Sequence, residues 1–199
     1  MFKPKTIRGL SYIASAVLLL GSVAPIQAQA VTYRIDPVHT FVVFRVKHMN
    51  TGFAYGRFNT ISGTLVVDER NPGNSSIEFE IDASSVDTGN NDRDNHLRSP
   101  DFFNARQFPK ITFKSTRVRR INDNTVEVTG NLTLRGQTRP LTTRVTFTGK
   151  GRNQRGQELI GFETTFTIRR SQFGMTYGLQ GNGLADEVRV TVSVEGIRQ

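Results

Sequence analysis

The stretch SIEFEID (residues 76–82) alternates strictly between polar and apolar residues. Successive side chains of a β-strand point to opposite faces, so Ile77, Phe79 and Ile81 are expected on one face and the acidic side chains on the other. Such a strand covers a core on one side and meets water on the other. The stretch therefore predicts antiparallel β structure with a single apolar interior.

The same alternation recurs through the chain. Strands are predicted at residues 32–36, 40–48, 57–68, 76–82, 111–121, 125–135, 140–148, 160–168 and 187–195. Gly63 is expected to bend the third of these, and a polar loop is expected at residues 149–157. These segments amount to about eight substantial strands joined mostly by short turns, which indicates one all-β domain.

Two architectures fit consecutive strands that each have one apolar face, namely a β-sandwich and an up-and-down β-barrel. Several strands are ten or more residues long, and open edges of that length invite aggregation, which favours a barrel. A barrel of about eight strands is either filled by its own side chains or holds one elongated ligand. The chain has 14 phenylalanines and no tryptophan. Aromatic residues on inward faces fit both a filled core and an apolar cavity.

The segment DRDNHLRSPDFF (residues 92–103) interrupts the alternation. Asn91 or Asp92 is expected to cap a short helix there, and Pro100 limits its length. In one interpretation, salt bridges join Asp92 and Asp94 to the neighbouring arginines, and the helix closes one end of the barrel with Leu97, Phe102 and Phe103 facing inward. In the other, Arg93 and His96 share a helix face near a cavity mouth and contact a ligand's headgroup. The two interpretations are compatible.

Residues 1–30 have the pattern of a cleaved signal peptide. Basic residues precede an uncharged, apolar run at residues 9–24, and small residues follow, with cleavage expected after Ala30 or, alternatively, after Ala28. The run is short for a membrane span, although an uncleaved anchor helix is the alternative. With no cysteine in the chain, an exported domain at residues 31–199 has to fold without disulfides.

Composition and motifs argue against several functions. The formal net charge is +9, but the basic residues are spread over alternate strand positions, which is typical of a solvated face rather than of a nucleic-acid site. The same charge suits transient contact with an anionic membrane surface. His39, His48 and His96 match no metal-ligand spacing, and no nucleophile elbow or phosphate loop occurs. No catalytic residue, metal or required cofactor is predicted.

Several blocks occur in order along the chain, namely YRIDPVHT (33–40), FRVKH (44–48), GRF (56–58), RDNHLRSPDFF (93–103), FPKITFKST (108–116), GNLTLRGQT (130–138) and RSQFGM (170–175). Together they resemble the YceI-like family of polyisoprenoid-binding exported proteins. The resemblance implies an extended, lipocalin-like antiparallel β-barrel in the bacterial periplasm, with a short helical insertion and an apolar tunnel. Its implied ligand is an isoprenoid lipid, either a polyprenyl phosphate or pyrophosphate or a quinone. Fatty amides also occur in the family, and a homodimer is possible. Pro100 departs from the family pattern.

The predicted site consists of a tunnel and a headgroup contact. The residues predicted to line the tunnel are Val42, Phe44, Val46, Ile77, Phe79, Ile81, Leu97, Phe102, Phe113, Leu132, Phe147, Phe162, Phe166 and Met175. His48, Arg93 and His96 are the predicted headgroup contacts. The expected function is periplasmic binding, storage or transport of the lipid. The alternatives are an enzyme acting on such lipids and a ligand-free structural or stress-response protein.

Overall fold

The computed structural model describes residues 30–199, so most of the predicted signal peptide lies outside the described residues. Its strands are β1 (Val31–Ile35), β2 (Phe41–His48), β3 (Gly52–Phe58), β4 (Ile61–Val67), β5 (Ser76–Asp82), β6 (Val86–Asp87), β7 (Lys110–Asn122), β8 (Thr125–Leu134), β9 (Gln137–Arg152), β10 (Glu158–Arg169) and β11 (Leu184–Arg198). The helix α1 (Asn91–Arg98) lies between β6 and β7, and short 3₁₀ turns complete the fold. Between residues 30 and 199, no helix combines the length and the apolar character needed to cross a bilayer.

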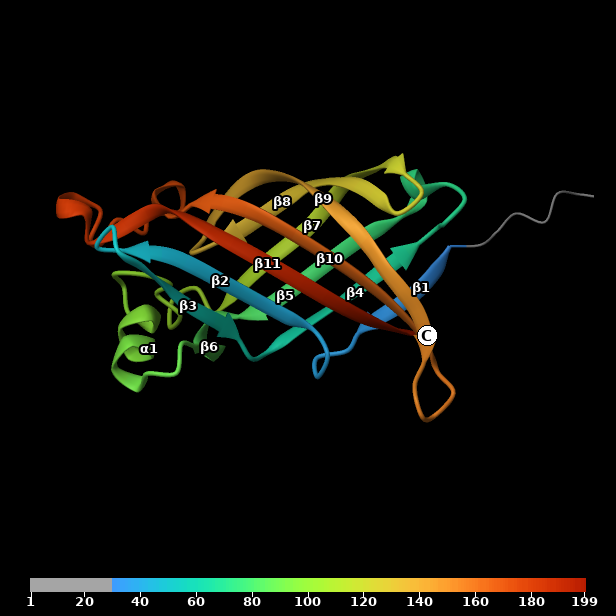
Figure 1. Cartoon of the computed structure of the whole chain (residues 1–199), viewed down its shortest axis with the longest axis horizontal. Coiled ribbons are helices and arrows are strands. Elements are labelled where there is room, and N and C mark those ends of the chain that lie inside the picture. The colour runs from blue at the N-terminus through green and yellow to red at the C-terminus, as the bar shows by residue number, and fades with distance from the viewer. Residues whose placement is uncertain (1–29) are drawn as a thin grey trace, which may run out of the picture.

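Eight of these strands form a closed antiparallel barrel. They follow the order β1-β4-β5-β7-β8-β9-β10-β11, and β1 pairs with β11 to complete the circle. The remaining strands, β2, β3 and β6, extend from the other half of β11 at the end of the molecule where α1 lies (Figure 1). The predicted barrel is thus confirmed, and the sandwich is excluded.

The strands at the α1 end of the barrel are broken rather than continuous. Both β1 and β2 pair with β11, through Tyr33↔Arg198 and Phe41↔Ser193, so the two strands form one bent ribbon. The prediction of one strand over residues 57–68 was wrong, because Asn59 and Thr60 separate β3 from β4. The hydroxyl of Ser85 accepts a hydrogen bond from the Thr60 backbone N–H at 3.1 Å, so a side chain from the 3₁₀ turn before β6 takes the place of a strand partner here.

The hairpin of β9 and β10 is longer than the sequence suggested. A loop was expected at residues 149–157, but β9 continues to Arg152 and β10 begins at Glu158. Gly149 pairs with Gly161 inside the ladder, and a register shift between Gly161 and Phe162 absorbs the irregularity. Cross-strand pairing therefore overrides the glycine turn signal, because the partner strand supplies hydrogen bonds that a loop would have left to water.

Candidate functional site

The barrel encloses a cavity of about 1060 Å³. This volume is slightly above the range of roughly 300–1,000 Å³ found for small-molecule sites. Phenylalanine, valine, isoleucine and leucine side chains from nearly every strand form its wall. The barrel interior is therefore hollow and apolar rather than filled by its own side chains.

All of the residues predicted to line a tunnel border this cavity, and so do His48, Arg93 and His96. Their contact with a lipid stays a prediction. Sequence reasoning left out a row of valines on β11 that also borders the cavity, namely Val188, Val190, Val192 and Val194. The signal for them was the alternation at residues 187–195, which placed these four on one face.

The two ends of the cavity differ in polarity. The turn between β2 and β3 and the helix α1 lie at one end of the barrel, and the turns β4–β5 and β7–β8 lie at the other (Figure 1). The α1 end presents His48, Arg93 and His96 to the cavity. The opposite end presents the carboxylates of Glu69 and Asp123 together with the guanidinium of Arg120. Basic groups border the cavity at the α1 end, whereas acidic and basic groups are mixed at the opposite end, so an anionic head meets more favourable charge at the α1 end.

Local hydrogen bonds fix the turn at the far end. The buried carboxylate of Asp68 accepts hydrogen bonds from the backbone N–H of Asn71 at 2.8 Å, the N–H of Arg70 at 3.1 Å and the Asn74 amide at 2.9 Å. The Asn71 N–H is the main cause of a lowered pKa for Asp68. Beside it, the ammonium of Lys150 contacts the Glu69 carboxylate. The Asp68 carboxylate and its hydrogen-bond donors at this end thus stabilise the turn.

Asn90 caps the helix α1, since its side-chain oxygen accepts a hydrogen bond from the backbone N–H of Arg93 at 2.9 Å. The prediction of Asn91 or Asp92 as the cap was wrong by one or two positions. Asn90 has an extended backbone, and an asparagine at that position can reach the N–H three residues on. Ser99 ends the helix immediately before Pro100.

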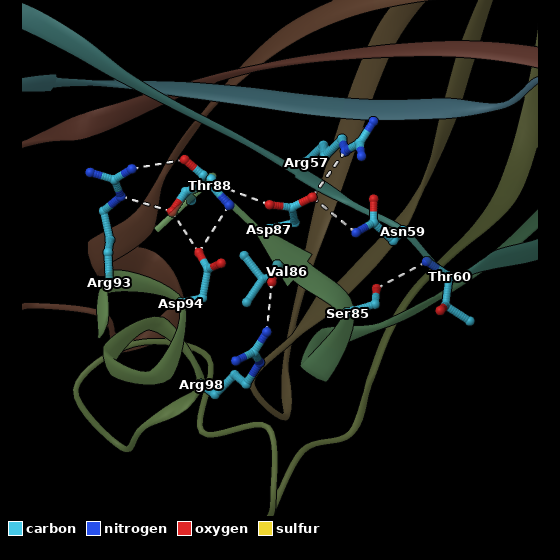
Figure 2. A network of polar contacts seen from close by, with 11 residues as sticks. Arg57, Asn59, Thr60, Ser85, Val86, Asp87, Thr88, Arg93, Asp94 and Arg98 are labelled. Carbon is cyan, nitrogen blue, oxygen red and sulfur yellow. Dashed lines mark hydrogen bonds and ion pairs between the residues drawn. The ribbon is translucent and has the colours of Figure 1, made fainter. Parts of the chain in front are cut away.

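The acidic side chains of α1 do not form the expected salt bridges with its arginines. Asp94 is 5% exposed and accepts hydrogen bonds from the Thr88 backbone N–H at 2.9 Å and from the Thr88 hydroxyl at 2.5 Å (Figure 2). Arg93 donates from Nε to the same hydroxyl and from Nη2 to the Thr88 carbonyl, both at 2.8 Å. Thr88 therefore lies between acid and base and sets the orientation of the Arg93 guanidinium at the cavity.

Two further contacts fasten α1 and β6 to the barrel (Figure 2). Arg98 donates to the Ser84 carbonyl at 2.7 Å and to the Val86 carbonyl at 2.9 Å. Asp87 accepts from the Asn59 amide at 3.1 Å and from Arg57 at 3.3 Å, and the Asn59 hydrogen bond is the main cause of a lowered Asp87 pKa. The strand β6 is therefore held by Arg57 of β3 and by Asn59, which follows β3.

His96 lies at the rim of the cavity. Its Nε2 atom is 2.9 Å from the Asp101 carboxylate. The ring packs edge-on against Tyr177, with centroids 4.7 Å apart, and against buried Phe102, with centroids 5.0 Å apart. The imidazole thus joins α1 to the loop before β11.

A second histidine lies in a group of titratable side chains on the outside of the barrel. His39 Nδ1 is 2.8 Å from an Asp36 oxygen and 3.5 Å from a Glu195 oxygen. The potential ligand atoms of all three residues lie within 4.8 Å of one another. A protonated His39 serves both carboxylates as an ion-pair partner. The prediction that the protein binds no metal stays a prediction.

We expect this group to make stability depend on pH. The hydrogen bond to Asp36 is the main cause that raises the pKa of His39 above the ordinary histidine value of about 6.5. Because the pKa is raised in the folded state, the pair stabilises the fold fully below about pH 6.5, and the contribution is lost as pH rises through the folded pKa. Thermal unfolding midpoints measured between about pH 6 and about pH 9 should show this loss. His39→Gln should remove that part of the pH dependence, and an unchanged profile would contradict the assignment.

The match to known proteins covers nearly all of the described chain. A family model described as a YceI-like domain matches residues 33–196. The chain belongs to the YceI-like family. A UPF0312 protein of Pseudomonas paraeruginosa is 40% identical over 197 residues, which is 98% of each chain.

Solved structures share the barrel of this YceI-like chain. The crystal structure of Burkholderia cenocepacia BcnA has a TM-score of 0.74 at 25% identity and covers 81% of this chain and 98% of its own. A structure described as a polyisoprenoid binding domain from Saccharophagus degradans has a TM-score of 0.68 at 17% identity, with 85% and 99% covered. At that identity, the second likeness supports the fold alone.

Proposed function

We propose that this YceI-like protein binds a long-chain isoprenoid lipid in the barrel cavity and stores or transports it in the periplasm. The observation that carries the proposal is the closed barrel with a hollow apolar interior of about 1060 Å³. The polyisoprenoid binding described for the Saccharophagus degradans domain, which shares this fold, is consistent with that ligand class. The predicted signal peptide at residues 1–30 is the basis for the periplasmic location.

The polarity of the cavity sets the orientation of the ligand in this proposal. The apolar tail lies along the valine and phenylalanine wall, and the head lies at the α1 end. Arg93 is the principal candidate for contact with a phosphate or a quinone oxygen there, because Thr88 holds its Nε and Nη2 atoms in place. No hydrogen bond from its Nη1 atom to another residue is found within residues 30–199, so that atom has donors to offer. His48 and His96 border the same region.

Native mass spectrometry of the protein purified from cells, followed by lipid extraction, tests the proposal. The expected result is a protein carrying one long-chain lipid whose extracted mass fits a polyprenyl phosphate, a polyprenyl pyrophosphate or a quinone. Protein that is empty on purification and takes up none of these lipids in solution would contradict it. Turnover of a bound lipid that is lost in His96→Ala would instead favour an enzyme.

Affinity should depend on the length of the ligand more than on its head. Burial of apolar surface contributes about 0.8 kcal/mol per methylene, so each five-carbon unit that enters the cavity adds substantially to binding. We expect Kd to rise at least about tenfold for each isoprene unit removed, which corresponds to about 1.4 kcal/mol. A titration series of polyprenyl phosphates of increasing length measures this. Affinity that changes with the head but not with the length of the chain would contradict burial of the tail.

A further inference from the structure

The outer wall of the barrel carries exposed aromatic side chains beside the cavity mouth. Phe53 and Tyr55 on β3 are 46% and 55% exposed, and Tyr177, in the loop before β11, is 50% exposed. Met49, in the turn between β2 and β3, is 62% exposed. Single exposed apolar residues are ordinary on a protein surface, but several gathered at one place indicate an interaction site.

Two cations lie against these aromatic rings on the same face. Lys47 pairs across the strands with Phe53, and Arg45 pairs with Tyr55, so all four side chains project outward from the sheet. The Arg45 guanidinium is 4.4 Å from the Phe53 ring centroid, and the Lys47 ammonium is 5.3 Å from it. Among the residues that the structure describes, no carboxylate forms a salt bridge with either cation. We call Arg45, Lys47, Phe53 and Tyr55 the β2–β3 face.

The β2–β3 face is continuous with the cavity. Beyond β2, β3 pairs only with β6, and only through Arg57 and Phe58, so residues 52–56 form an edge with no further strand beside them in the described chain. Although their side chains lie on the outer face, Phe53 and Tyr55 also border the cavity along this edge, together with Arg93 of α1. A molecule that touches the face is therefore next to an entrance to the interior.

We propose that the β2–β3 face docks on the surface of an anionic lipid bilayer, so that a lipid passes between the bilayer and the cavity beside β3. This proposal rests on the proposed function, because the lipid that passes is the ligand proposed for the cavity. Unpaired cations are attracted to lipid phosphates, and aromatic rings are favourable at the level of the headgroups, because one part of the ring is apolar and another is polar or polarisable. The β2–β3 face has a cation and an aromatic ring in each of its two cross-strand pairs.

Charge argues against a second copy of the chain as the occupant of this face. A twofold-symmetric contact brings the same patch of both copies together. It would place Arg45 and Lys47 against the same cations of the partner copy, and Arg189 stands opposite Arg45 on β11 and adds to the repulsion. Juxtaposed like charges disfavour such a contact, whereas an anionic bilayer complements them.

Flotation with vesicles of phosphatidylcholine containing phosphatidylglycerol tests the docking. Each basic residue near such a surface contributes about 1 kcal/mol, so Arg45→Gln/Lys47→Gln should lower the partition coefficient about thirtyfold. Arg117→Gln/Arg155→Gln is the matched control, because it removes the same charge from two exposed positions away from the face. The control should stay within about threefold of the parent protein. Raising the ionic strength should weaken binding of the parent protein, a measurement that needs no variant.

Lipid uptake from dilute detergent solution, measured on the same proteins, separates this proposal from the proposed function. Normal vesicle binding without any lipid uptake would contradict the proposed function and leave the docking intact. Equal vesicle binding by the double variant and its control would overturn the docking. Sedimentation that shows a dimer in the parent protein and a monomer in Arg45→Gln/Lys47→Gln, with vesicle binding unchanged, would overturn it in favour of an interface between copies.

Discussion

Replacing Arg170 by methionine is expected to lower the free energy of unfolding by about 3–5 kcal/mol, because buried hydrogen-bond acceptors lose a charged donor. Arg170 is 3% exposed and donates to three carbonyls, those of Ala185 at 2.8 Å, Met175 at 2.9 Å and Leu184 at 2.9 Å. Burial lowers its pKa, and the nearby Asp186 opposes that effect. Urea unfolding monitored by circular dichroism measures the change.

Arg169→Met is the matched control for this experiment. Arg169 is the neighbouring residue, it is exposed, and no hydrogen bond or salt bridge of its side chain is found within residues 30–199. Its replacement should change stability by no more than about 0.5 kcal/mol. Arg170→Lys should recover only part of the loss, because an ammonium cannot reproduce the planar fork that reaches three carbonyls. Equal stability of Arg170→Met and Arg169→Met would contradict the role assigned to Arg170.

The Phe162→Asp protein is expected to lose lipid uptake by at least about a hundredfold. Phe162 borders the cavity from β10 and packs edge-on against Phe147, with ring centroids 5.8 Å apart. A carboxylate at this position would have to stay hydrated or be buried against the lipid tail, and either state opposes binding by several kcal/mol. Phe79→Asp should act in the same way from the opposite part of the wall. Titration with a polyprenyl phosphate measures the loss.

Two further variants keep the Phe162 prediction testable if the charge also weakens the fold. Ile121→Asp introduces the same charge at a position on β7 that is 38% exposed and does not border the cavity, so uptake should be unchanged. Val190→Trp places a larger apolar side chain in the cavity and should shorten the longest lipid that binds. A folded Phe162→Asp protein with the parent's affinity would contradict binding in the barrel.

The barrel and its apolar wall could be predicted because they depend on a period of two residues. Residues 76–82 form β5 with the bounds that their alternation indicated, and Phe79 and Ile81 border the cavity. The family blocks added support for the closed topology, which alternation alone leaves open. What separates a hollow barrel from a filled one is the size and placement of side chains from many strands, and no local pattern carries that information.

The errors have a common physical origin in side-chain contacts outside the regular helix and strand spacings. Asn59 and Thr60 break a predicted strand because Asp87 of β6 and Ser85 of the preceding 3₁₀ turn provide hydrogen-bond partners. The role of Arg170 depends on carbonyls five to fifteen residues further along the chain. Asp94 lacks its expected arginine partner because Thr88 takes its place. None of these partners follows from the helix or strand period.

The seam between β1 and β11 has a consequence for how quickly the chain reaches its final state. Tyr33 pairs with Arg198, so this seam joins segments from the two ends of the described sequence. A contact of such large sequence separation carries a high entropic cost of loop closure and slows folding relative to hairpins such as β7–β8. The hairpins can form as each segment is synthesised, but the ring cannot close before β11 exists. A chain extending from its N-terminus thus carries hairpins but no closed barrel, and no enclosed cavity, until its last strand is made.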